Sequence, residues 1–240
     1  MWKNKTVSVV FPTYNEKESI KDAIEEFFAT GYVDEIIVIN NNAAKGTEEE
    51  VKKTKAKHII ETTQGYGYSI RRGLKEAKGD YVIVSEPDGT FVGNDVIKLL
   101  AYSDDFDAVF GTRTSSILIG DGANMGLFLK YGNFFVAKYM ELLFNTHQLT
   151  DAGCTMRLIK RNSLSKINNS FRIGGNSFGP EMMMLIFIHK ISSIEIPLNY
   201  RERVGESSVT GSFWKALKLG FQMIFIVTKV RFLSLFGLYK

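Results

Sequence analysis

Cysteine is almost absent from this chain of 240 residues. Cys154 is the only one, so no disulfide can form within the chain, and a reducing compartment is the simplest location for it. The basic residues do not gather into long runs and the formal net charge is only +4, so the charge gives no reason to expect a nucleic-acid partner. Residues 1–5 lead directly into a strand-like segment, which leaves no room for a secretory signal. These absences favour a cytoplasmic protein.

Two glycine-rich nucleotide-binding turns are also missing. The apolar run 7–11 predicts a buried strand that Pro12 ends, and Pro12-Thr13-Tyr14-Asn15-Glu16 follows it. A dehydrogenase would have a Gly-x-Gly-x-x-Gly turn at this point, and a sugar nucleotidyltransferase would have a loop rich in glycine and arginine. The sequence argues against both classes.

What the chain does contain is a regular alternation of strands and helices. A hydrophobic content of 45% and a charged content of 23% are typical of a folded globular protein. Apolar runs predict five strands, at 7–11, 34–39, 58–60, 80–84 and 107–111. Helices are predicted between them, at 18–30, 47–55, 65–77 and 94–102. This order predicts an α/β fold, with a mostly parallel, Rossmann-like central sheet and helices on both faces.

The second half of the chain is less regular. Residues 114–126 are rich in serine and glycine and predict a mobile loop, and an apolar, aromatic helix is expected over 127–144. We further predict a strand at 155–159, a helix at 179–189, a strand at 194–196 and a basic loop over 200–208. No internal repeat and no clear domain linker is evident.

Glu86 and Asp88 are two carboxylates placed two residues apart at the end of the fourth strand. They can project to the same side and hold a divalent cation whose remaining ligands come from a phosphate. Alternatively, Pro87 and Gly89 make this an ordinary acidic turn. Ligands of open α/β sheets bind beyond the carboxyl ends of the strands, and most of the other strand ends here are also polar. That convergence favours the metal site.

Several blocks of the sequence, in register, resemble the family-2 glycosyltransferases of the GT-A fold, and especially the dolichol-phosphate or polyprenyl-phosphate sugar transferases. The similarity covers nearly the whole chain. The blocks are Pro12 to Glu16, Asn40 to Thr47, Thr63 to Leu74, Glu86-x-Asp88, Gly111-Thr112-Arg113, Thr150 to Arg157, Gly179-Pro180-Glu181 and Arg203-x-Gly205-x-Ser207.

This resemblance implies an inverting transfer from a nucleotide-sugar donor with Mg²⁺ or Mn²⁺. It places Glu86 and Asp88 on the metal, and Arg113 and Arg157 beside an acceptor phosphate. It assigns catalytic roles to Asp88, Asp151, Glu181 and Arg203. It assigns donor binding to Pro12, Thr13, Tyr14, Glu16, Asn40, Asn42, Gly65, Arg72, Glu86, Arg203 and Ser207.

The possible functions differ in the chemical class of the acceptor. A polyprenyl phosphate is already anionic near pH 7 and needs no general base, whereas a glycan hydroxyl needs one, for which Asp151 or Glu181 is the nearest choice. A third possibility is a catalytically silent protein that only binds a nucleotide sugar. Because the Gln-x-x-Arg-Trp signature of processive synthases is missing, we expect transfer of a single sugar.

Four positions depart from the family pattern. Asn40 and Asn41 stand where many relatives have aspartate, and asparagine can donate as well as accept a hydrogen bond, so the nucleobase stays open. Glu86 replaces the more frequent aspartate, and Ser208 replaces a lysine.

The C-terminal tail is apolar and basic. Its apolar stretch nearly has the length to span a bilayer, but Lys229 and Arg231 interrupt it, and such a charge costs about 2.5–3.5 kcal/mol at a helix centre. Lys215, Lys218 and Lys229 fall on one helical face, which predicts an amphipathic helix in the membrane interface, although a helix packed on the core is the alternative. We therefore expect a transferase domain over 1–210, with a donor half at 1–113 and an acceptor half at 114–210, and an interfacial tail over 211–240. Such a protein would be peripheral on the inner face of the membrane; the sequence leaves its oligomeric state open.

Overall fold

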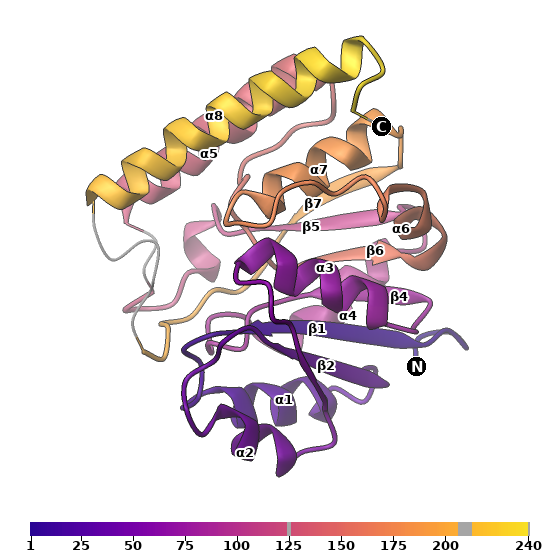
Figure 1. Cartoon of the computed structure of the whole chain (residues 1–240), viewed down its shortest axis with the longest axis vertical. Coiled ribbons are helices and arrows are strands. Elements are labelled where there is room, and N and C mark those ends of the chain that lie inside the picture. Colours follow the sequence, from indigo (N-terminus) through magenta and orange to yellow (C-terminus); the bar gives the residue numbers. More distant parts are fainter. Residues whose placement is uncertain (124–125, 206–212, 240) are drawn as a thin grey trace.

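A single mixed sheet forms the centre of the molecule, with helices on both of its faces (Figure 1). The computed structural model describes residues 1–123, 126–205 and 213–239. Within these ranges the seven strands have the order β3-β2-β1-β4-β6-β5-β7. Their bounds are β1 (Val7–Thr13), β2 (Glu35–Asn40), β3 (Lys57–Ile60), β4 (Tyr81–Val84), β5 (Ala108–Thr112), β6 (Arg157–Lys160) and β7 (Ser193–Pro197).

The helices divide between the two faces. Their bounds are α1 (Ile20–Ala29), α2 (Thr47–Lys52), α3 (Tyr66–Glu76), α4 (Asp95–Tyr102), α5 (Leu127–Phe144), α6 (Arg161–Ile167), α7 (Phe178–Ile188) and α8 (Phe213–Leu235), and a 3-10 turn, η1, covers Ser116–Leu118. Successive residues of a strand point to opposite faces. Val9 and Phe11 therefore pack with α1 and α4, while Val10 and Ile39 pack with α3, α5, α7 and α8.

The strand β6 runs antiparallel between β4 and β5. Its first residue, Arg157, pairs with Val84 of β4 and with Phe110 of β5. Because the strand is reversed, its beginning lies at the edge where its parallel neighbours end. The loop that precedes β6 therefore meets the end of β4, which is where Glu86 and Asp88 follow.

Several local predictions need correction. Pro12 does not end β1, which continues to Thr13 and stays paired with β2. The ladder between β1 and β4 ends at Val10 and Val84, so the missing N–H of Pro12 interrupts nothing on that side. The helix α6 was not predicted. Within the described part of the loop over 114–126, η1 forms and Ile119 bridges to Tyr200; its mobility stays a prediction.

The C-terminal helix α8 packs along α5 and against α7 (Figure 1). Met223, Val227 and Val230 are buried within the core on the α3 face, and the Tyr139 and Thr228 hydroxyls lie 2.9 Å apart across the helix pair. The tail therefore contributes to the core along one side. No helix in the described ranges combines the length and the apolar character needed to cross a membrane.

Candidate active site

A cavity of about 660 Å³ opens at the carboxyl ends of the parallel strands and extends to α5 and α8. Its lining comes from both halves of the chain and from the tail. From the first half come Pro12, Thr13, Tyr14, Glu16, Asn41, Gln64, Gly65, Tyr66, Ser69 and Glu86. From the second half come Arg113, Leu129, Gly132, Asn133, Phe135, Val136, Gly153, Thr155, Asn176, Tyr200 and Arg203. From α8 come Leu217, Leu219, Gly220, Phe221, Met223 and Ile224.

Glu16 organises the loop after β1. One carboxylate oxygen, Oε2, accepts hydrogen bonds from the backbone N–H groups of Tyr14 (2.7 Å) and Asn15 (2.9 Å) and from the Thr13 hydroxyl (3.2 Å). The loop is thereby folded back on itself, with the Tyr14 ring left exposed at the cavity. Oε1 remains available, and it faces an arginine from the far end of the chain.

That arginine is Arg203, which bridges two acidic residues. Its Nη2 donates a hydrogen bond to Glu16 Oε1 at 2.8 Å, and its Nη1 lies 2.8 Å from Asp88 Oδ2. The backbone fixes this approach, because Val204 N–H donates to the Asp88 carbonyl at 2.9 Å. Asp88 Oδ1 is held in turn by the backbone N–H and the hydroxyl of Thr90. Residues up to 187 positions apart in the chain thus form one charged cluster.

Glu86 is buried beside Asp88 and accepts a hydrogen bond from the Tyr66 hydroxyl at 3.0 Å. Burial, and then repulsion from Asp88, raise the pKa of Glu86 to about 8, although Arg203 and Tyr66 act in the opposite direction. Asp88 Oδ2 is also buried, and within the described residues it accepts no well-directed hydrogen bond. Three carboxylates therefore share one arginine, and a second cation would relieve their repulsion.

The donor set fits a divalent ion that brings other ligands with it. Carboxylate oxygens are ligands that Mg²⁺ and Mn²⁺ accept, and Mg²⁺ is typically held by one or two carboxylates together with substrate phosphates. Across the described ranges, no three carboxylate, histidine or cysteine side chains converge closely enough to hold a metal by themselves. Glu86 and Asp88 would thus need phosphate or water oxygens to complete the shell.

Arg113 faces the cavity from the second half, and Asp151 holds it there. Nε and Nη2 of Arg113 donate to the two Asp151 oxygens at 2.8 and 3.0 Å, and the guanidinium lies over the Tyr200 ring. Burial alone would raise the pKa of Asp151, but Arg113 and two backbone N–H groups hold it below its ordinary value. Both oxygens of Asp151 are therefore occupied by strong donors. This geometry opposes the expected role as a general base and makes Asp151 a support for Arg113.

Arg157 and Glu181 were also expected at the reaction centre, and the structure places both behind it. Arg157 is buried, and it donates to the carbonyls of Gly179 (2.7 Å) and Cys154. Glu181 is fully buried and accepts from the backbone N–H groups of Arg172 and Ile173 and from the Tyr239 hydroxyl. Neither side chain lines the cavity, and the phosphate contact of Arg157 and the base role of Glu181 stay predictions.

Only some of the residues expected to bind the nucleoside lie at the cavity. Asn40 uses its carbonyl oxygen to accept from Ala43 N–H, and its Nδ2 lies 3.2 Å from His58 Nε2; it does not line the cavity. Its neighbour Asn41 does, and it accepts from Gly65 N–H at 2.8 Å. Asn42 is exposed, with a positive φ of 61°. Arg72 pairs with Glu76 on α3, and Ser207 lies outside the described residues.

Sequence reasoning missed some of the cavity residues. Asn41 and Tyr66 stood inside blocks already recognised, but Asn40, Asn42, Gly65 and Arg72 were chosen there instead, and of these Gly65 lines the cavity. Thr155 and Tyr200 also stood in segments that the sequence singled out, but neither was chosen as a site residue. Thr155 reaches the cavity just before antiparallel β6, and Tyr200 reaches it in the segment after β7. Asn176, just before α7, carried no signal of its own.

Comparison with known proteins identifies the family. Residues 8–167 match the model for glycosyl transferase family 2. The chain belongs to that family.

Relatives of this family-2 glycosyltransferase include a hexosyltransferase of glycan biosynthesis and a dolichyl-phosphate glucosyltransferase. It is 27% identical over 213 residues to the low-salt glycan biosynthesis hexosyltransferase Agl6 of Haloferax volcanii. This match covers 85% of the present chain and 50% of Agl6. It is 24% identical to human dolichyl-phosphate beta-glucosyltransferase, over 96% of this chain and 76% of the relative. The chain thus spans half the length of Agl6.

Among solved structures, the family-2 chain resembles glucosyl-3-phosphoglycerate synthase from Mycobacterium tuberculosis, determined with Mn²⁺, uridine diphosphate and phosphoglyceric acid. The TM-score is 0.70 at 17% identity, and the match covers 96% of this chain and 78% of the synthase. At this identity the likeness establishes the fold, which is the expected GT-A fold.

Proposed function

We propose that this family-2 glycosyltransferase moves a single sugar from a nucleotide-sugar donor to a polyprenyl phosphate at a membrane surface, with inversion. One observation carries the proposal. A single cavity joins the charged cluster of Glu86 and Arg203 to the apolar helices α5 and α8. A donor diphosphate suits the first end, and a phosphate with a long apolar chain suits the second.

The donor would bind over the first half of the chain, residues 1–113. Glu86 and Asp88 would hold Mg²⁺ or Mn²⁺ together with oxygens of the diphosphate. The ion, when bound, offsets the negative charge that grows on the leaving diphosphate. Arg203 would contribute a second positive charge to the same oxygens, and the loop over 12–16 would frame the nucleoside. The Mn²⁺ and uridine diphosphate of the mycobacterial synthase support this choice of ligands.

The acceptor would bind over residues 114–210, with Arg113 directed at its phosphate. An acceptor phosphate needs no general base, and this agrees with the full occupation of Asp151 by Arg113 and of Glu181 by backbone donors. Leu129, Phe135 and Ile224 line the other end of the cavity, where an isoprenoid chain would lie. The human relative's name, dolichyl-phosphate beta-glucosyltransferase, supports the same class of acceptor.

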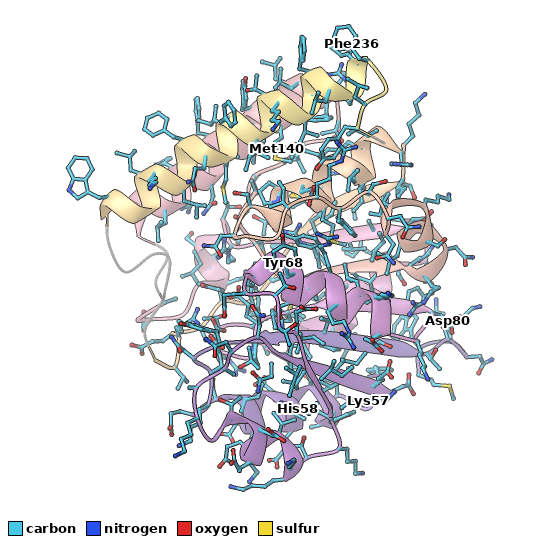
Figure 2. The ribbon with its side chains drawn as sticks, viewed as in Figure 1. Lys57, His58, Tyr68, Asp80, Met140 and Phe236 are labelled. Atoms are coloured by element: carbon cyan, nitrogen blue, oxygen red, sulfur yellow. The ribbon has the colours of Figure 1, made fainter. Side chains whose placement is uncertain are left out.

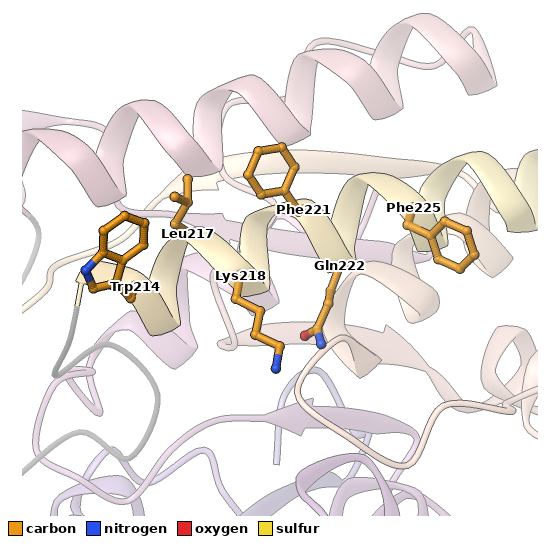
Figure 3. A pocket seen from close by; sticks show the side chains of 6 residues that line it. All are labelled: Trp214, Leu217, Lys218, Phe221, Gln222 and Phe225. Carbon is orange, nitrogen blue, oxygen red and sulfur yellow. The ribbon is translucent and has the colours of Figure 1, made fainter.

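Exposed aromatic and basic side chains on the helix pair suit a membrane surface. Phe221 and Phe225 are 65% and 68% exposed, and Figure 3 shows them with Trp214 and Lys218 around a shallow surface pocket on α8. Figure 2 shows Phe236, just beyond α8, at the outer edge of the molecule. The side chains of α8 include four basic residues and no acidic one, which complements an anionic bilayer. We place the protein on the cytoplasmic, inner face of the membrane.

The test is an acceptor assay preceded by a donor panel. UDP-, GDP-, CDP- and TDP-sugars are first screened with Mg²⁺ or Mn²⁺ by thermal shift, because a ligand specific for the native state raises the melting temperature. The stabilising donor, radiolabelled, is then supplied with undecaprenyl or dolichyl phosphate in detergent. We expect the label to enter a solvent-extractable lipid. Donor hydrolysis without a lipid product would contradict the proposed acceptor and favour a glycan hydroxyl instead.

A further inference from the structure

Tyr239, close to the C-terminus, is buried against the catalytic core. The guanidinium carbon of Arg172 lies over the Tyr239 ring, 4.4 Å from the centroid of that ring. The Tyr239 hydroxyl donates a hydrogen bond to Glu181. Arg172 also donates to the carbonyl of Leu238 at 2.7 Å. Three separate interactions therefore fix the segment that follows α8.

Glu181 also binds a turn of the backbone at residues 172–173. Besides Tyr239, its carboxylate accepts from the N–H of Arg172 at 2.8 Å and of Ile173 at 3.0 Å. Because Glu181 is fully buried, water cannot replace any of these donors without a local opening. A single carboxylate thus joins the end of the chain to the segment 172–174.

The segment 172–174 in turn holds residues 65–68, which we call the glycine-rich turn. The carbonyl of Gly174 accepts from the N–H groups of Gly67 (2.9 Å) and Tyr68 (3.2 Å), at the start of α3. These are among the N–H groups that a helix leaves without partners in its first turn, and α3 has no side-chain cap. A Cβ at Gly65 would come within 2.3 Å of the Gly174 oxygen, so the contact requires glycine. Figure 2 marks Tyr68 at this end of α3.

The glycine-rich turn belongs to the donor end of the cavity. Gly65 and Tyr66 line the cavity, and Tyr66 donates its hydroxyl to Glu86. A displacement of this turn would therefore move a direct partner of a residue assigned to the metal.

We infer that Tyr239 and Glu181 are positioning residues for the donor site, acting through segment 172–174 on the glycine-rich turn. The C-terminus that follows α8 is thereby coupled to the groups that hold the donor. The inference rests on the proposed function for its consequence in catalysis, but the mechanical link itself is independent of it.

Hydrogen exchange tests the link directly, without nucleotide. In Tyr239→Phe the ring remains and only the hydroxyl is lost. We expect the rate of amide exchange in a peptide spanning 65–70 to rise about three- to tenfold, because that is the factor that loss of one hydrogen bond produces. Exchange in β1 should stay unchanged. The matched control is Tyr102→Phe, because Tyr102 is an exposed tyrosine on α4. Unchanged exchange at 65–70 would overturn the inference.

Glu181→Gln provides a second variant, because one amide oxygen cannot serve all of the donors that the carboxylate holds. We expect the same peptide to exchange faster in this variant. Both variants should raise the KM for the donor about three- to tenfold while kcat changes less than twofold. Loss of kcat with an unchanged KM would contradict a positioning role. If the wild-type protein binds no nucleotide sugar, the proposed function fails while the exchange result still decides the link.

Discussion

Arg203 Nη1 lies 2.8 Å from Asp88 Oδ2, across an interval of 115 residues in the sequence. The other end of the same guanidinium reaches Glu16, so the arginine neutralises part of the acidic cluster while the donor is absent. A diphosphate would offer the guanidinium further anionic oxygens. The residue is therefore placed to exchange carboxylate partners for phosphate when the donor binds.

Replacement of Arg203 tests this role. In Arg203→Ala, kcat should fall about 10²-fold, the typical effect of removing one donor that stabilises transition-state charge, and Arg203→Lys should recover part of it. Steady-state kinetics at saturating donor provide the measurement. Arg201→Ala is the matched control, since exposed Arg201 pairs with Glu26 at 3.3 Å and its loss should leave kcat unchanged.

Neutral replacements of the two carboxylates should abolish metal dependence. In Glu86→Gln and Asp88→Asn, the rise in melting temperature that Mn²⁺ and a nucleoside diphosphate produce together should disappear, because each variant loses an anionic ligand. The variants should still fold, since Glu86 and Asp88 repel each other in the metal-free protein. Asp105→Asn, at an exposed site, serves as the control. A full metal response in both variants would move the metal site elsewhere.

The buried pair of Arg113 and Asp151 predicts a dependence of stability on pH. Asp151→Asn should lower the free energy of unfolding by about 3–5 kcal/mol at pH 7, the cost of breaking a buried ion pair. The pKa of Asp151 lies below its ordinary value of 3.8, so its contribution is present above that pH and is lost as the pH falls through the folded pKa. Denaturant unfolding of both proteins should therefore give curves that converge in acid. A constant difference across the whole range would contradict this account.

The exposed rings of α8 predict binding to vesicles. Phe221→Ser combined with Phe225→Ser should weaken cosedimentation with anionic vesicles at least tenfold, since full burial of each ring contributes roughly 1.5–3 kcal/mol. The control is Ile97→Ser with Tyr102→Ser, two exposed apolar residues on α4. Equal binding of both double variants would show that α8 does not mediate attachment.

The sequence predicted the strands and most helices because their apolar patterns are local. Buried, β-branched runs marked β1, β2, β4 and β5, and α5 was predicted with the bounds that the structure shows. The reversed insertion of β6 was not predicted, because strand order depends on contacts between distant residues. Pro12 shows a related limit of prediction from sequence. Proline disfavours a strand, but β1 continues through Pro12 because its pairing with β4 ends earlier, at Val10.

The charged centre of the site could also be anticipated, whereas the roles of its supports could not. Glu16, Glu86 and Arg203 stand in recognisable blocks, and the fold brings them together. Asp151 and Glu181 stand in equally recognisable blocks, yet their oxygens are occupied by Arg113 and by backbone donors. A motif identifies a carboxylate but does not show which hydrogen-bond donors surround it. Those donors decide whether the carboxylate can accept a proton from a substrate.

The antiparallel position of β6 limits how this enzyme can move during turnover. Hydrogen bonds tie β6 on one side to the strand that leads to Glu86 and on the other to the strand that leads to Arg113. A hinge between residues 1–113 and residues 114–210 would have to break both of these ladders, together with the ladder between β5 and β7. Any movement that admits substrate or releases product would therefore involve the loops above the sheet and leave the sheet itself intact.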